Sequence, residues 1–339
     1  MKTNKYNIVG MIIIVCNINC LKLMSQIETT SIHSDIQQRV NEWLRTLSAE
    51  EKISLLTGTG MGDPEDGNAL SNSNSPVPGS SGSTRELSRY GIPSLIMTDG
   101  PAGVRIDSVR KNEQRTYYAT SFPVGTALAC TWDTALVRKV GMCIGNEALE
   151  YGSDIQLTPG MNIMRNPLCG RNYEYYSEDP VVSGNMAAAL VQGIQSQGVS
   201  ATPKHFVANN NETSRMSIDV RVSQRALREI YLRGFEIAVK EGKPKAIMSS
   251  YNKVNGIYTS ARKDLLTTLL RDEWGFEGMV MSDWYGGFPG IVQGDIGRDA
   301  CTLQQVLAGN DLLMPGTRSQ EEDLKKRMEE RGNYRRRYR

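Results

Sequence analysis

Several polar residues of this sequence stand directly after short apolar runs. The runs are followed by Asp99, by Lys204 and His205, by Tyr251, and by Asp283 with Trp284. If the runs are parallel strands, their carboxyl ends lie on one face of the fold, and residues far apart in the chain meet there. The sequence therefore predicts a single polar pocket built from segments between positions 99 and 283.

These residue types suit the cleavage of a glycosidic bond. Acetal hydrolysis needs carboxyl groups beside the scissile bond, and sugar recognition needs charged or planar groups around the ring hydroxyls, with an aromatic platform. Asp283 is the candidate nucleophile and Trp284 the candidate platform. The candidate hydroxyl-binding groups are Asp99 and the cations Arg105, Arg171, Lys204 and Arg215. None of these residues is identified as a general acid.

Two of these residues have a structural alternative. A charged residue in the mouth of a barrel must be paired or solvated, which favours a substrate-facing Asp283, but the same residue could cap a following helix. His205 could bind hydroxyls beside Lys204, or it could be a buried histidine whose hydrogen bonds are satisfied. A Ser-His-Asp triad would have to use His205, because His33 is the only other histidine.

Apolar runs alternate with helical stretches along the chain. Strands are expected at Ser94 to Met97, Ile155 to Leu157, Ala201 to Pro203, Ala246 to Ser249 and Gly278 to Met281; helices are expected at Pro180 to Gln197, Ser223 to Glu241 and Asp264 to Trp274. This alternation predicts an α/β fold with a parallel sheet. A closed barrel and an open doubly wound sheet both fit the alternation. Because no Gly-rich phosphate-binding motif follows the first strands, we favour a (β/α)8 TIM-type barrel or an irregular version of it.

The predicted barrel occupies residues 35–316. Helices are expected over Ile36 to Leu47 and Ala49 to Leu56, and the second begins with the capping-box spacing of Ser48 and Glu51. Residues 58–83 are rich in Gly, Ser, Asn and Pro and predict a long loop. Residues 317–339 form a charged C-terminal tail, whose first part could be an exposed helix and which we interpret as the start of a linker.

Composition narrows the function further. The 339 residues are 39% hydrophobic and 22% charged, and 39 Lys and Arg nearly balance 37 Asp and Glu. This is typical of a globular chain without a general attraction to nucleic acid or anionic membranes. A neutral small molecule is therefore the expected partner. The weak alternative is a nucleic-acid-binding protein that uses the arginine-rich end at 335–339.

The N-terminus resembles a secretory signal. Lys2 and Lys5 precede a short apolar run at 8–15, which is too short to span a bilayer. We expect a signal peptide over about residues 1–25, a secreted or periplasmic product, and no membrane association after its removal. The cysteines at 130, 143, 169 and 301 lack metal-site spacing, so we expect small buried side chains with at most one disulfide. No metal and no cofactor are implied.

Five strings taken together resemble glycoside hydrolase family 3. They are DGPAGVR at 99–105, GRNYEYYSEDP at 170–180, KHFVANNNETSR at 204–215, MSSYN at 248–252 and MSDWYGG at 281–287. The resemblance is to the β-glucosidase-like branch and to its N-terminal barrel domain. It implies that Asp283 is the nucleophile of a retaining β-glucosidase. It also implies that sugar binding is carried by Asp99, Arg105, Arg171, Lys204, His205, Arg215, Tyr251 and Trp284.

The same resemblance leaves the general acid unassigned. In that branch the acid is a Glu of a second α/β sandwich domain, and the sequence lacks that domain after residue 316. We expect β-linked glucosides or oligosaccharides as substrates, acted on fully only with that missing C-terminal domain. The alternatives are a truncated sugar-binding remnant without turnover, or β-xylosidase specificity.

Overall fold

The computed structural model describes residues 35–60, 75–110, 113–286 and 302–337, with side chains of the last segment described up to 330. The predicted signal peptide at 1–25 lies outside these residues. The chain divides into two units, Met1–Lys52 and Ile53–Arg339. In the first unit, residues 35–46 are helical, and α2 (Ala49–Leu55) begins in this unit with the predicted capping box. The amide of Glu51 donates to Ser48 Oγ at 3.2 Å and the amide of Ser48 donates to Glu51 Oε2 at 2.8 Å.

The second unit contains three small sheets. The first has four strands in the order β1-β2-β3-β4, the second pairs β6 with β9, and the third has the order β5-β7-β8. The strands are β1 (Gly82–Ser83), β2 (Ile96–Asp99), β3 (Ile155–Leu157), β4 (Ser200–Ala201), β5 (Asp219–Val220), β6 (Ala246–Ser249), β7 (Lys253–Val254), β8 (Ile257–Tyr258) and β9 (Met279–Ser282). All five expected strands are present: β3 and β6 have the predicted ends, and the ends of β2, β4 and β9 are shifted by one or two residues. The strands β2, β3 and β4 are parallel, as are β6 and β9, whereas β1 runs antiparallel to β2.

The first two sheets are linked through single bridges. Phe206 pairs with Ser249 of β6, Leu312 pairs with Met281 of β9, and Thr57 pairs with Leu313. Thr59 then pairs with Ser83 of β1. The pairings thus return to β1, and they connect the segments 57–59, 82–83, 96–99, 155–160, 200–206, 246–249, 279–282 and 312–313 into one closed circuit.

Side chains of these strands point alternately to two apolar clusters. Met248 and Met281 lie in an inner cluster with Met97, Leu157 and Met314. Ile247 and Val280, their neighbours along β6 and β9, lie in the larger outer cluster with the helices. Because successive residues of a strand face opposite sides, the continuous apolar runs of the sequence correspond to strands that are buried on both faces.

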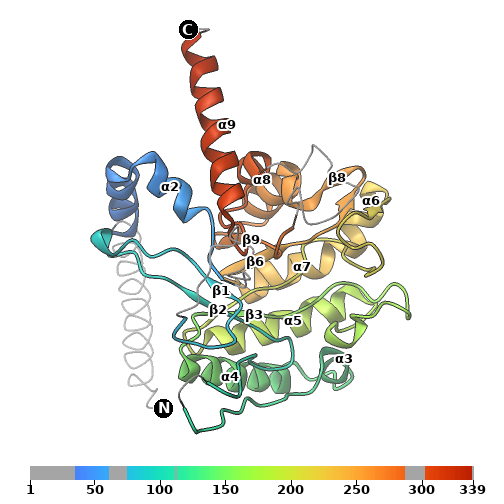
Figure 1. The fold of residues 1–339 in the computed structure, drawn as a ribbon. Coiled ribbons are helices and arrows are strands. Elements are labelled where there is room, and N and C mark those ends of the chain that lie inside the picture. The colour runs from blue at the N-terminus through green and yellow to red at the C-terminus, as the bar shows by residue number, and fades with distance from the viewer. Residues whose placement is uncertain (1–34, 61–74, 111–112, 287–301, 338–339) are drawn as a thin grey trace, which may run out of the picture. The chain divides into compact units, whose positions relative to one another are not determined.

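Helices cover the outer side of the strands (Figure 1). They are α3 (Gly125–Ala129), α4 (Thr134–Tyr151), α5 (Pro180–Gln195), α6 (Gln224–Ala226), α7 (Arg233–Ile237) and α8 (Thr302–Ala308), with π-helical stretches at Leu227–Tyr231, Ala238–Gly242 and Asp264–Glu273 and short 3₁₀ turns at Ser88–Tyr90, Asn172–Glu174 and Thr259–Ala261. A further helix, α9 (Arg318–Arg337), contacts α8. The helices expected between the strands are present; the one at 223–241 is divided into α and π stretches, and the one at 264–274 is π-helical. The predicted charged tail at 317–339 is helical through most of its length as α9.

Helix α4 was not predicted, although the sequence carries its signals. Asp133 caps its N-terminus by accepting a hydrogen bond from the amide of Leu136, and Gly152 ends it in a left-handed conformation. Its buried residues Val137, Ile144 and Ala148 have helical spacing. The exposed apolar residues between them obscure this pattern in the sequence.

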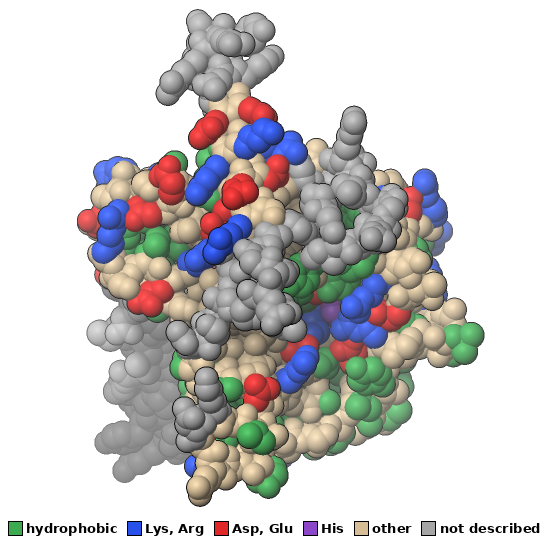
Figure 2. Space-filling model, viewed as in Figure 1, with side chains coloured by type: hydrophobic (Ala, Val, Ile, Leu, Met, Phe, Trp, Pro, Cys, Tyr) green, Lys and Arg blue, Asp and Glu red, His purple; other side chains and the backbone are tan. Residues whose placement is uncertain are grey.

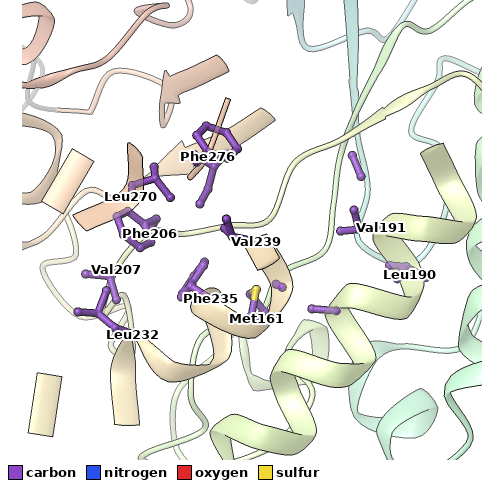
Figure 3. Close-up of a cluster of buried hydrophobic side chains, with 14 of the residues drawn as sticks. Met161, Leu190, Val191, Phe206, Val207, Leu232, Phe235, Val239, Leu270 and Phe276 are labelled. Carbon is purple, nitrogen blue, oxygen red and sulfur yellow. The ribbon is translucent and has the colours of Figure 1, made fainter. Parts of the chain in front are cut away.

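The outer cluster fills the space between strands and helices (Figure 3). Phe206, which follows β4, stacks edge-on against Phe235 of α7 with ring centroids 5.2 Å apart. Helix α5 lies between α4 and α7 and is buried almost all round. Its start is fixed by Asp179, whose Oδ1 accepts hydrogen bonds from the amides of Val181 and Val182.

The prediction of buried cysteines was wrong. Cys130 and Cys143 are free and exposed and Cys169 is free and half-buried, whereas Cys301 lies outside the described residues. Cys143 lies on the solvent side of α4, where a thiol needs no packing partner. In the described part of the chain, no helix is both long and apolar enough to cross a bilayer.

A test of this packing is Gly193→Ala in α5. A Cβ there would lie 2.2 Å from the carbonyl oxygen of Arg138 in α4, so the two helices must separate. We expect a loss of about 1–3 kcal/mol in the free energy of unfolding, measured by urea titration. The control is Gly170→Ala, where nothing lies within 4 Å of the new Cβ. Equal stability of the two variants would contradict the close α4–α5 contact.

Candidate active site

A pocket of about 360 Å³ lies at the carboxyl ends of the strands. Asp99 is the last residue of β2, Asp283 follows β9 directly, and Tyr251 lies two residues after β6. The pocket is lined by Ser81, Asp99, Arg105, Leu157, Arg171, Lys204, His205, Arg215, Met248, Tyr251, Asp283, Trp284 and Tyr285. All nine residues predicted from the sequence therefore meet there. Figure 2 shows basic and acidic side chains gathered in this hollow.

Asp283 lies deep in the pocket, with 7% of its surface exposed. Its amide donates to the carbonyl oxygen of Ser249 at 3.1 Å, which ties the residue to the end of β6. Its Oδ1 accepts a hydrogen bond from the amide of Trp284 at 2.7 Å. Its Oδ2 is buried and has no hydrogen-bond partner within the described residues. One carboxylate oxygen is thus fixed by the backbone, and the other is left for a ligand. Residues 284–286 form a turn, so the alternative of a helix cap at Asp283 is not seen.

The acidity of Asp283 reflects two opposing effects. Burial raises the pKa of Asp283 to about 6, although the Tyr251 hydroxyl and the charges of Arg171 and Lys204 lower it. The carboxylate is therefore ionised at neutral pH in spite of its burial. An ionised group held against a desolvation cost is typical of a catalytic position.

Asp99 and Lys204 form the second charged element of the pocket. Lys204 Nζ lies 2.7 Å from Asp99 Oδ1, and Arg105 lies on the other side, 4.0 Å from Oδ2. Burial pushes the pKa of Asp99 up, but Lys204, the amide of Gly100 and Arg105 outweigh it and hold the pKa below its usual value. Asp99 is thus a firm hydrogen-bond acceptor at any pH near neutrality, and it is not a proton donor there.

His205 is buried, is held in place by hydrogen bonds and lines the pocket. Asn162 accepts from the His205 amide at 2.8 Å and donates to the His205 carbonyl oxygen at 2.9 Å. Nε2 of His205 lies 3.8 Å from Asp283 Oδ2. Burial, together with Arg171, Lys204 and Arg215, holds the pKa of His205 well below its usual value, so the imidazole is neutral. A neutral imidazole can exchange hydrogen bonds with a hydroxyl without adding charge beside Asp283.

Aromatic residues form the remaining walls. The Arg215 guanidinium lies over the Tyr251 ring, 4.9 Å from its centroid, and Glu212 holds that arginine at 2.9 Å. Burial raises the pKa of Tyr251, and the nearby Asp283 carboxylate raises it further, so the phenol stays protonated. The Trp284 indole donates from Nε1 to the carbonyl oxygen of Ser81 at 2.9 Å. This bond fixes the ring plane at the edge of the pocket.

Four lining residues were not predicted. Leu157 and Met248 belong to predicted strands, and Tyr285 follows the predicted Asp-Trp pair, so each had a signal in the sequence. Tyr285 turns the chain with a left-handed φ of 62°. Ser81 had none, because it lies in the Gly- and Ser-rich segment predicted to be a loop. The bridge from Thr59 to Ser83, the pairing of β1 with β2 and the hydrogen bond from Trp284 Nε1 to Ser81 hold that segment at the pocket.

The described residues contain no cluster of His, Cys, Asp or Glu that could hold a metal ion. Among the described residues, the carboxyl groups that line the pocket are those of Asp99 and Asp283. Asp99 pairs with Lys204, and Asp283 accepts a hydrogen bond from the amide of Trp284. The pocket offers several hydrogen-bonding groups to a hydroxyl-bearing molecule, together with one buried carboxylate oxygen of Asp283.

Comparisons with known proteins identify the family of this chain. Residues 75–332 match the glycosyl hydrolase family 3 N-terminal domain. Beta-glucosidase A of Butyrivibrio fibrisolvens is 50% identical over 228 residues, which cover 67% of this chain and 25% of that protein. A beta-glucosidase of Rhizobium radiobacter is 41% identical over 277 residues, which cover 82% of this chain and 30% of that protein.

A solved structure gives the same result for the fold. Beta-glucosidase 3B from Thermotoga neapolitana, in complex with glucose, superposes with a TM-score of 0.77 at 51% sequence identity, covering 86% of this chain and 40% of that one. The chain thus spans a quarter to two-fifths of the length of these relatives. It belongs to glycosyl hydrolase family 3, through the N-terminal domain of that family.

Proposed function

We propose that this chain carries the sugar-binding and nucleophilic part of a retaining β-glucosidase, with Asp283 as the nucleophile. The observation that carries the proposal is the buried Oδ2 of Asp283, which has no hydrogen-bond partner among the described residues, in a pocket lined by all the predicted hydroxyl-binding groups. The relatives named β-glucosidase, and the relative solved with glucose, support terminal β-linked glucose as the bound sugar.

We also infer that the second unit is an irregular (β/α)8-type barrel. The closed circuit of pairings supports this inference, as do the inner cluster of apolar residues and the outer layer of helices. Its irregularity comes from the antiparallel β1 and from links made by single bridges. The pocket then lies where active sites of such barrels are found, at the carboxyl ends of the strands.

In the proposed first step, Oδ2 of Asp283 attacks the anomeric carbon of the sugar. A C–O bond forms to the carboxylate, the bond to the leaving oxygen breaks, and that oxygen takes the electron pair. Asp99, Lys204 and Arg171 surround the ring hydroxyls and hold the sugar for this attack. In the second step, water attacks the same carbon and loses a proton to bulk solvent, and the C–O bond to Asp283 breaks with its electron pair returning to the carboxylate.

The leaving oxygen also needs a proton, and neither carboxyl group that lines the described pocket can supply it. Asp99 is ionised beside Lys204, and Asp283 is the nucleophile. We propose that the acid comes from a second domain, as the family resemblance implies, and that a substrate with a good leaving group avoids the need for it. Loss of acid assistance costs on the order of 10² to 10⁴ in rate. We also propose that a signal peptide at about residues 1–25 directs export of the protein.

The first prediction is covalent labelling of the chain. Incubation with an activated 2-deoxy-2-fluoro-glucoside should add one fluoroglucosyl group to the protein, because the slow second step traps the ester. Intact-mass analysis measures the adduct. Asp283→Asn should give no adduct, and the exposed Asp272→Ala should label as the wild type does. A folded wild-type chain that never labels would instead favour the non-catalytic sugar-binding remnant.

A second prediction concerns the pH dependence of labelling. The attacking group must be ionised, and burial raises the pKa of Asp283 to about 6. The second-order labelling rate should be level above about pH 7 and fall toward tenfold per pH unit below 6. Mass spectrometry between pH 4.5 and 8 gives the profile. A profile that breaks near pH 4 would show that Asp283 is not desolvated.

A third prediction concerns stability. The pKa of Asp283 is raised on folding, from an unfolded value of 3.8 to about 6, so its ionisation destabilises the folded state above pH 6 and has no effect below about pH 4. Asp283→Asn should therefore stabilise the chain at pH 7.5, by on the order of 3 kcal/mol. This gain should vanish at acid pH. Urea unfolding at both pH values tests it, and a less stable Asn variant at pH 7.5 would contradict the prediction.

A further inference from the structure

Glu174 is a buried carboxylate that does not line the pocket. Its side chain is 2% exposed, and it pairs with Nε of Arg171, whose side chain does line the pocket. Acidic side chains are almost never buried so completely unless they are paired. Among the described residues, the Arg171 side chain donates a hydrogen bond from Nε to Glu174. Its two terminal nitrogens are therefore available to a ligand.

The local backbone explains the pairing. Residues Asn172–Glu174 form a 3₁₀ turn that begins at Arg171, and the amide of Glu174 donates to the carbonyl oxygen of Arg171 at 3.1 Å. Side chains three residues apart eclipse each other on such a turn. Glu174 therefore lies directly beside Arg171. In an α-helix, side chains three residues apart would be offset around the axis.

Helix α3 holds this turn in place. Thr126 Oγ1 donates to the carbonyl oxygens of Asn172 and Tyr175, each at 3.1 Å. Gly125 lets the helix approach this closely, because a Cβ there would lie 2.6 Å from the carbonyl oxygen of Glu174. The backbone that carries Glu174 is thus held by contacts that do not involve the Arg171 side chain.

We propose that Glu174 is a positioning residue that holds Arg171 by Nε and so aims its two terminal nitrogens at the bound sugar. The inference rests on the proposed function of the pocket. A guanidinium is planar, so fixing Nε fixes the direction of both terminal nitrogens. Glu174 also places a compensating negative charge beside the mostly buried Arg171 guanidinium. From this position Arg171 interacts electrostatically with Asp283.

The test compares Glu174→Met, which removes the acceptor oxygen at similar size, with Glu174→Gln, which keeps one. Labelling by the activated 2-deoxy-2-fluoro-glucoside gives a rate constant, and quenching of tryptophan fluorescence gives the Kd for glucose. We expect Met to slow labelling and weaken glucose binding at least tenfold, and Gln to restore most of both. The control is Glu236→Met, in the exposed pair with Arg233 at 2.9 Å, which should change either value less than twofold.

Repeating both substitutions in an Arg171→Met background separates positioning from a structural role. If Glu174 acts through Arg171, neither substitution should then change the labelling rate more than twofold. If the effects of the two sites multiply, or if Glu174→Met labels like the wild type, the inference is wrong. Should Glu174→Met fail to fold, the Gln variant in both backgrounds makes the same comparison. A wild type that neither labels nor binds glucose would overturn the proposed function instead.

Discussion

The pocket depends on keeping one carboxylate charged while removing it from water. Asp283 loses hydration on folding, and the structure offsets part of that loss with the Tyr251 hydroxyl and with the charges of Arg171 and Lys204. The Arg171 and Lys204 side chains are themselves largely removed from water, so each is stabilised by pairing with a carboxylate. Asp99 pairs with Lys204 and Glu174 pairs with Arg171, whereas Glu212 pairs with Arg215. The result is a set of ion pairs around a carboxylate oxygen that has no hydrogen-bond partner within the described residues.

This arrangement requires a rigid frame, because charges several ångströms apart must keep their distances in a medium of low polarity. The frame is provided by parallel strands with side chains buried on both faces. Met97, Met248, Met281 and Met314 fill the space between strands that are short and irregularly linked. Unbranched methionine side chains adapt to such an irregular space better than branched ones do. The amide of Asp283 donates a hydrogen bond to Ser249, and the amide of Ser282 donates one to Leu312, so the segment that carries Asp283 is held on two sides.

The desolvated carboxylate of Asp283 lowers the stability of the folded chain. An ionised Asp283 weakens the folded state near neutral pH, which is common where a function needs a desolvated charge. The family membership and the proposed role of Asp283 rest on different grounds. Membership rests on matching sequence over residues 75–332, whereas the proposed role rests on burial, charge and a carboxylate oxygen without a hydrogen-bond partner among the described residues.

Much of this protein could be predicted from its sequence. The strand positions followed from apolar runs bounded by polar residues, and the helix at 180 followed from Asp179 and Pro180, because burial on both faces and helix capping leave local patterns. The nine pocket residues were found because they follow strands or belong to the family strings. Helix α4 was missed because exposed apolar residues, Leu136 and Leu149 among them, obscure its buried stripe, and the exposure of Cys143 depended on which side of that helix it lies.

Other features were decided by the tertiary structure alone. No local pattern shows that Ser81 reaches Trp284, since the pairing of β1 with β2 and with Thr59 brings it there. The sequence also cannot show that Glu174 is buried behind Arg171, because that depends on how closely α3 approaches a 3₁₀ turn. Residue types and their order along the chain determined which groups could do chemistry. Distances, burial and the resulting pKa of Asp283 depend on contacts between segments far apart in the chain, and only the folded structure sets them.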